Sequence, residues 1–314
     1  MRQTLCIALT SFLLIGYLHV ADAPLAVNLM AQETQATGES EKPKARGYYM
    51  PTRITVRYMD EKVIAQEGIP EWLAMAVKVI RENYPRYDIY LQTEGHIPSG
   101  DITLQAESSG AIGWNSNTTI GFSIEWIKPG AGGEKDWGMI AHELVHFVQN
   151  YRGGEGTGLP GWVTEGIADY MRHVFFEPEK EMRPFNAREN YDGAYQVTAA
   201  FFMYIVDTYD KDFVKTLNES GRKRTYSEDI FEKSTGKNVE ALWAEYDEKV
   251  RQPHMAARTK MVPAKQFPNL MKYKKEFDEY FATLKEESRP GQQQPGQGQP
   301  RQGQGRQRPP ANEG

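Results

Sequence analysis

The 314-residue sequence contains a single cysteine, Cys6, and this scarcity excludes two kinds of stabilising element. One thiol cannot form an intramolecular disulfide, and it cannot supply a structural zinc site built from several cysteines. Cys6 also lacks the small preceding residues of a lipid-modified cysteine. The folded chain is therefore expected to be stabilised by packing, or by a metal that histidines and carboxylates bind.

The sequence also lacks an excess of positive charge and a second long apolar run. Its formal net charge is -5 and its pI is about 5.8, which argues against a nucleic-acid partner because phosphate binding needs a concentrated basic surface. No apolar stretch after the N-terminal one is long enough to cross a bilayer. The processed protein is accordingly expected to be soluble, with no stable membrane association.

The N-terminus has the pattern of a signal peptide. Arg2 precedes a nearly charge-free apolar run at 5–20, and Ala21 and Ala23 have the spacing of a cleavage site. This predicts a signal peptide at 1–23 and a secreted or periplasmic protein. Pro24 leaves the cleavage position open, and an uncleaved membrane anchor is the alternative, although a span needs about 20 residues.

The rest of the chain divides by composition into a linker, one domain and a tail. Residues 24–46 are polar and charged, which predicts a flexible linker. Residues 286–314 are dominated by Gly, Gln, Pro and Arg, which predicts a disordered tail. The domain at 47–285 places strand patterns before helical ones, so the predicted fold class is α+β. The strands are expected at 54–58, 89–92, 102–105 and 119–124, with a helix at 72–81 and mostly helices from 135 to 250.

A metal-binding pattern occurs in the segment AHELVHFVQ. His142 and His146 are four residues apart in a predicted helix at 137–149, so their imidazoles share one face and can reach a single ion. This spacing suits tetrahedral zinc, and Glu143 between the histidines is the candidate general base. Two histidines on an ordinary helix face, with Glu143 merely exposed, are the alternative.

A second predicted helix, at 160–173, supplies the candidates that would complete the site. Glu165 follows His146 after eighteen intervening residues, and two histidines with one glutamate leave a fourth zinc position for water. Asp169 lies one turn later on the same face and would accept a hydrogen bond from a ligand histidine, or be an ordinary exposed carboxylate. His173, a further turn on, is expected to be a surface histidine near the helix end.

These two helices resemble those of the basic secretory protein family, peptidases of plants and bacteria. The likeness lies in HELVHFVQ followed by WVTEGIADY, and extends over residues 50–252 through AIGWNSNTTIGFSIEWI, YDGAYQVTAAFFMYI and TYSEDIFEKSTGKNVEALWAEY. The pattern is also similar to the gluzincin branch of zinc peptidases. The resemblance implies a zincin-like domain that binds Zn²⁺ through His142, His146 and Glu165, with Glu143 as the base.

The resemblance further implies hydrolysis of a peptide or protein substrate. Tyr195 and Tyr191 are candidates for the donor to the developing oxyanion, and Tyr195 is preferred because it begins a predicted helix at 194–209. The Gly-x-Met-x-Asn type of motif that reads a free amino terminus is absent, which favours an endopeptidase. The strand predicted at 120–126, which leads into the helix of His142 and His146, is a candidate to pair with an extended substrate. An exported, non-catalytic binding protein and a zinc hydrolase of cell-wall peptide amides are the other readings.

Overall fold

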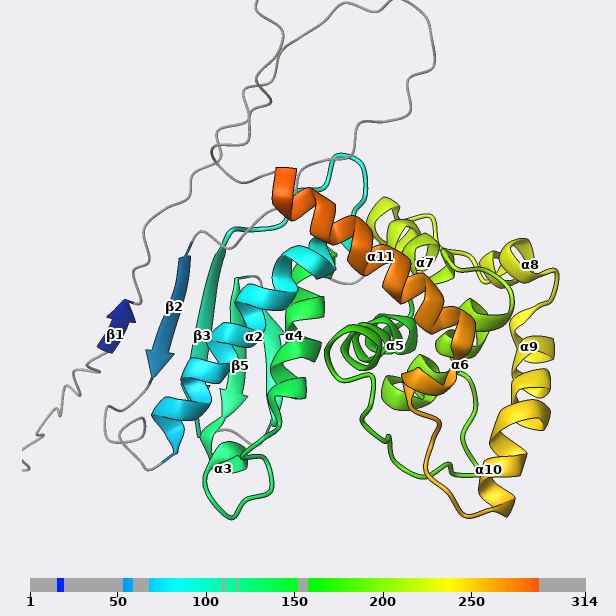
Figure 1. Cartoon of the computed structure of the whole chain (residues 1–314), viewed down its shortest axis with the longest axis horizontal. Coiled ribbons are helices and arrows are strands. Elements are labelled where there is room, and N and C mark those ends of the chain that lie inside the picture. The colour runs from blue at the N-terminus through cyan, green and yellow to red at the C-terminus, as the bar shows by residue number, and fades with distance from the viewer. Residues whose placement is uncertain are drawn as a thin grey trace, which may run out of the picture.

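The fold combines a small mixed sheet with a larger helical part, so the α+β class expected from the sequence is confirmed. A computed structural model describes residues 16–19, 53–58, 68–108, 111–116, 118–151 and 158–287. Figure 1 shows α2 (Ile69–Tyr90) and α4 (Trp137–Gln149) lying together along the sheet, and most of the helices after residue 160 gathered on the far side of α4. The core is one continuous apolar cluster that extends from the sheet through these helices.

The sheet has one buried side and one solvent-facing side. Its strands are β1 (Gly16–His19), β2 (Arg53–Tyr58), β3 (Asp101–Glu107), β4 (Gly113–Ser116) and β5 (Thr119–Ser123). Their order is β1-β2-β3-β5-β4, with β2, β3 and β5 parallel and the two outer strands antiparallel to their neighbours. Every second residue of β2 and β3 is buried, which is the pattern of a sheet with helices on one face. The predicted strands at 54–58, 102–105 and 119–124 are thus confirmed to within a few residues.

The helical part begins with α2 and continues after the sheet. Its longer elements are α2 (Ile69–Tyr90), α4 (Trp137–Gln149), α5 (Gly161–Met171), α6 (Tyr195–Thr208), α7 (Phe213–Lys223) and α11 (Pro268–Glu287). Shorter helices are α3 (Ile124–Ile127), α8 (Asp229–Thr235), α9 (Val239–Tyr246) and α10 (Gln252–Ala256). Two π-helical turns, η1 (Arg172–Phe176) and η2 (Asp247–Arg251), and the 3₁₀ turn η3 (Ala264–Gln266) complete the set. None of the described helices combines the length and apolar character needed to span a bilayer.

The strand expected at 89–92 is wrong, because α2 continues through this segment to Tyr90. Pro85 lies inside the helix, where its missing N–H and its ring disfavour the helical backbone. Tyr84 and Tyr87 are fully buried on the same helix, on either side of the proline. The burial of two large rings at helical spacing therefore outweighs the local cost of the proline.

The helix predicted at 137–149 is α4, with the same ends. Its last residue is followed by Asn150 in the left-handed conformation (φ 35°), a common helix stop. The helix predicted at 160–173 is α5, which runs from Gly161 and passes directly into η1. Gly166 lets α5 and α6 come together, since a Cβ there would lie only 2.2 Å from Thr198 Cγ2. This close approach fixes the depth of the neighbouring residue, Glu165.

The predicted leader, linker and tail fall mostly outside the described residues. Residues 1–15, 20–52 and 288–314 are not described, so nothing in the structure bears on these assignments. The exceptions are β1, which lies within the predicted leader, and the last two residues of α11, which lie within the predicted tail.

Candidate metal centre

Three side-chain atoms converge where α4 faces α5. His142 Nε2 lies 3.1 Å from His146 Nε2 and 3.1 Å from Glu165 Oε2, and His146 Nε2 lies 3.2 Å from the same oxygen. The histidines are one turn apart on α4, and α5 brings the carboxylate to them. Among the described residues, His142, His146 and Glu165 are the group whose ligand atoms could hold a metal ion.

Each histidine is oriented by a hydrogen bond from its other ring nitrogen. His142 donates Nδ1–H to Asp169 Oδ1 at 2.7 Å, and His146 donates Nδ1–H to Gln149 Oε1 at 2.7 Å. Gln149 in turn donates to the carbonyl of Thr164 at 3.2 Å. These contacts direct both Nε2 atoms to the shared centre, as the outer contacts of metal-binding histidines do.

The charges around the centre favour a cation. Burial alone would lower the pKa of His142, but its hydrogen bonds to Asp169 and Glu165 outweigh burial and raise that pKa to about 10. Burial would raise the pKa of Glu165, but the hydrogen bonds to His142 and His146 lower it to about 2. Asp169 and Glu165 thus favour a proton on His142. A metal ion would take the place of that proton.

Glu143 lies beside the centre without belonging to it. Burial raises the pKa of its carboxyl, against the opposing effect of His142 and His146. Space for this carboxylate depends on Gly113 in β4, because a Cβ there would lie 2.7 Å from Met139 Sδ and 3.1 Å from Glu143 Oε1. Because glycine has no side chain, β4 can lie against α4 at Gly113 and still leave room for the side chain of Glu143.

The centre opens into a cleft of about 770 Å³. Its walls come from β4, α4, α5 and the start of α6, and include Ile112, Trp114, Asn115, Asp136, Thr164, Arg172, Arg183, Tyr195 and Gln196. Within the described part of the sheet, β4 pairs only with β5, and β5 is paired on both sides. The expectation that β5 offers a free edge to a substrate is therefore wrong. The strand at the edge is β4.

Tyr195 stands at the mouth of the cleft. Its ring stacks on that of His142, with centroids 5.9 Å apart, and 55% of the residue is exposed. Ala194 and Tyr195 have φ values of 59° and 47°, a conformation that costs energy in residues other than glycine and is concentrated at functional sites. Tyr191 instead packs edge-on against Trp162 at 5.4 Å. Of the two predicted tyrosines, Tyr195 is the one in the cleft.

Two residues that support the site, Gln149 and Arg172, were not predicted from the sequence. Gln149 could have been found by its spacing, because it lies three residues after His146 on the same helix. Arg172 could not, since its partner at the start of α4, Asp136, is 36 residues away in sequence. It binds Asp136, just before α4, at 3.2 Å and Glu177 at 2.5 Å, and so ties the start of the metal helix to η1.

The expectation that His173 lies on the surface is wrong. It is 1% exposed in η1, an element that packs against α4 and η3, and neither ring nitrogen has a hydrogen-bond partner among the described residues. The chain covers this face through tertiary packing, which helical spacing does not reveal. His173 does not belong to the cation-binding group.

His173 is expected to make the fold sensitive to acid. Burial lowers its pKa to about 4, against 6.5 in the unfolded chain, so the unfolded chain takes up the proton first as the pH falls. Stability is intact above pH 6.5 and declines by up to about 3 kcal/mol towards pH 4. Urea unfolding of the wild type and His173→Leu, both with chelator, should show a smaller loss between pH 7 and 4.5 in the variant. Equal losses would contradict this prediction.

A model of a known protein family matches the part of the chain that carries the site. A family model described as peptidase of plants and bacteria matches residues 70–246, which is more than half of the chain and includes both site helices. Neither the curated proteins nor the solved structures contain a match. The family resemblance noted from the sequence is confirmed, and the chain belongs to this family of peptidases of plants and bacteria.

Proposed function

We propose that this protein is an exported, zinc-dependent endopeptidase with a zincin-like fold. The observation that carries the proposal is the triangle of His142 Nε2, His146 Nε2 and Glu165 Oε2, with sides of 3.1–3.2 Å. Ligands 2.0–2.1 Å from a tetrahedral zinc ion lie roughly 3.3 Å apart, so the group needs little rearrangement to take the metal. Three protein ligands leave the fourth position open, as in hydrolytic zinc sites.

Zinc bound there would supply an acidified water and polarise the scissile carbonyl. Glu143 is placed to accept a proton from the attacking water and to pass it to the leaving nitrogen. Its raised pKa suits the first step, because a more basic carboxylate accepts a proton from water more readily than an exposed one does. Asp169 and Gln149 keep the two histidines in the required tautomer.

An extended peptide would bind along β4. This strand has one edge free of strand pairing in the described structure, and it borders the cleft that holds Glu143. Backbone pairing to such an edge reads the main chain and places alternate side chains on opposite sides. The absence of a motif that reads a free amino terminus supports cleavage of internal bonds.

Export is proposed on the N-terminal apolar run at 5–20 behind Arg2. Cleavage near residue 23 would remove β1, which lies within that segment, and leave β2 at the edge of a four-stranded sheet. The mass of the chain recovered outside the cytoplasm tests this directly. A full-length mass would instead support the uncleaved anchor.

The proposed function is tested by zinc content and turnover of the purified chain. We expect about one equivalent of zinc by elemental analysis and cleavage of internally quenched peptides. Chelation should reduce cleavage to background, and added zinc should restore it. Zinc without turnover of peptides or of peptidoglycan would favour a binding protein, and turnover of peptidoglycan alone would favour a cell-wall amide hydrolase. A chain that binds no metal would overturn the proposal.

Tyr195→Phe is expected to lower kcat by about 10²–10³-fold, with KM and zinc content nearly unchanged. In the proposed mechanism the phenol donates to the developing oxyanion, and removal of such a donor costs about this much. The Phe ring retains the stacking on His142. Tyr191→Phe is the matched control, since Tyr191 packs on Trp162, and it should leave kcat within about twofold of the wild type. A Tyr195→Phe enzyme with the same kcat as the control would exclude Tyr195 as the donor.

A further inference from the structure

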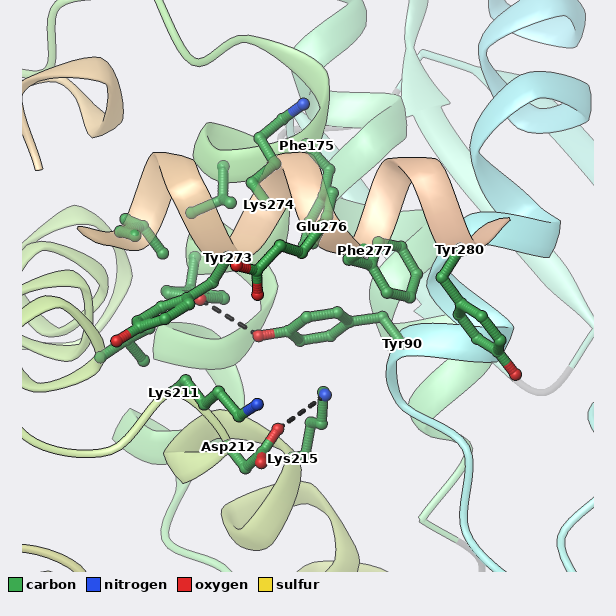
Figure 2. A pocket seen from close by; sticks show the side chains of 14 residues that line it. Tyr90, Phe175, Lys211, Asp212, Lys215, Tyr273, Lys274, Glu276, Phe277 and Tyr280 are labelled. Carbon is green, nitrogen blue, oxygen red and sulfur yellow. Dashed lines mark hydrogen bonds and ion pairs between the residues drawn. The ribbon is translucent and has the colours of Figure 1, made fainter. Parts of the chain in front are cut away.

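A second cavity, separate from the metal cleft, lies beneath the C-terminal helix. It has a volume of about 210 Å³ and is walled by the end of α2, by α5 and η1, by the start of α7, and by α11 (Figure 2). It shares no lining residue with the metal cleft. The α11 wall lies beyond residue 246, where the family match ends. The cavity is therefore not accounted for by the proposed catalytic site.

One side of the cavity is aromatic. Tyr90 meets Phe277 edge-on at 5.2 Å and Phe175 at 4.8 Å, and Tyr280 stands 39% exposed at the same wall. Figure 2 shows the rings of Phe277 and Tyr280 on the same side of the Tyr90 ring. These faces form a surface for a flat or bulky apolar group.

Of the charged side chains that line the cavity, one basic and one acidic group have no ion-pair partner among the described residues. Lys215 pairs with Asp212 at 2.7 Å, and Lys274 pairs with Asp278 at 2.6 Å. Glu276 on α11 and Lys211 before α7 have no hydrogen bond or ion pair with any other described residue. Figure 2 shows their charged ends approaching the Tyr90 hydroxyl from opposite sides. Because they line one cavity without forming an ion pair, a ligand between them would meet a negative group on one side and a positive group on the other.

The tyrosine hydroxyls in the cavity add a hydrogen-bond donor. Tyr90 and Tyr170 share one hydrogen bond, with their oxygens 3.2 Å apart. One hydroxyl donates its proton to the other, so the pair keeps one O–H that it does not use itself. Burial raises the pKa of both phenols, so this donor stays protonated. It can bind a carboxylate together with Lys211.

We propose that this cavity binds a free α-amino acid with an aromatic or large aliphatic side chain. The ammonium group would bind Glu276, the carboxylate would bind Lys211 and the spare tyrosine proton, and the side chain would pack on Phe277 and Tyr280. The small volume suits a single amino acid better than a drug-sized ligand or a longer peptide. A ligand with only one of the two charges would leave Glu276 or Lys211 without a partner.

Equilibrium dialysis of the zinc-loaded chain against labelled L-phenylalanine tests the proposal. We expect saturable binding, and binding about tenfold weaker for N-acetyl-L-phenylalanine and L-phenylalaninamide, which each lack one charge. Glu276→Gln should weaken L-phenylalanine about tenfold and abolish its advantage over the acetylated form. Lys211→Gln should likewise abolish its advantage over the amide. Glu279→Gln and Lys272→Gln, on the same helix but outside the cavity, are the matched controls and should bind as the wild type does.

Three results would overturn the proposal. The first is the absence of saturable binding at millimolar amino acid. The second is binding that Glu276→Gln and Lys211→Gln leave unchanged, which would place the amino acid elsewhere, for instance at the zinc. The third is equal binding of acetate and of the amino acid, which would reduce the cavity to a simple anion site. Lys211 and Glu276 are both exposed, so the Lys211→Gln and Glu276→Gln variants are expected to fold.

Discussion

Glu143→Gln is expected to lower peptide turnover by about 10²–10⁴-fold while zinc remains bound. The amide has the shape of the carboxylate but cannot accept a proton from water. Glu143 lies outside the group formed by His142, His146 and Glu165, so its replacement leaves the three ligands in place. Gln also fits the space beside Gly113 that the native side chain uses.

The measurement is kcat/KM on a quenched peptide, together with zinc content by elemental analysis on the same preparation. Glu179→Gln is the control, because Glu179 is an exposed carboxylate whose ion-pair partner is Lys265, away from the cleft. A Glu143→Gln enzyme with at least a tenth of the wild-type kcat/KM would rule out Glu143 as the base. Loss of zinc along with activity would mean that Glu143 supports the metal rather than the proton transfer.

Glu165→Ala is expected to abolish stable zinc binding and, with it, peptide turnover. The substitution removes one of three ligands and leaves two histidines on a single helix. Asp169→Asn and Gln149→Leu should have the smaller effect of outer contacts, a 10–100-fold weaker zinc affinity. In Asp169→Asn the amide can donate to His142 Nδ1, which would place the proton on Nε2 and block that ligand atom.

Competition with a chromophoric chelator gives the zinc affinities of the wild type and of the Asp169→Asn, Gln149→Leu and Glu165→Ala variants in one series. We expect the wild type to bind most tightly, the two outer-contact variants next and Glu165→Ala least. Circular dichroism of the metal-free chains shows whether each variant is folded, and Glu165→Gln serves if the alanine variant is not. Zinc affinity of both Glu165 variants equal to that of the wild type would remove Glu165 from the ligand set.

The local sequence was sufficient wherever the relevant contacts lie within one helix. His142 and His146 face the same way because they are four residues apart, and α4 has the ends that its sequence predicts. Glu165 and Asp169 share a face of α5 for the same reason. What the sequence could not fix was the distance between α4 and α5, which depends on how these two helices pack in the folded chain.

Tertiary contacts decided the positions where the sequence-based expectations were wrong. Pro85 favours a helix end, but two buried tyrosines keep α2 intact across it. His173 has the spacing of an exposed residue, but it is buried in η1, an element that packs against α4 and η3. β5 was expected to offer a free edge, but β4 pairs with its outer side. In each case contacts with other elements of the fold determine the outcome.

The sequence by itself determined which groups are available: the imidazole pair, the carboxylate between them and the carboxylate on the following helix. Only the tertiary structure decided how these groups meet. It set the 3.1–3.2 Å separations of His142 Nε2, His146 Nε2 and Glu165 Oε2, placed Asp169 behind His142, and put β4 rather than β5 at the edge of the sheet beside the cleft. The physical reason is that helix periodicity fixes which side chains share a face, whereas long-range packing fixes what that face meets.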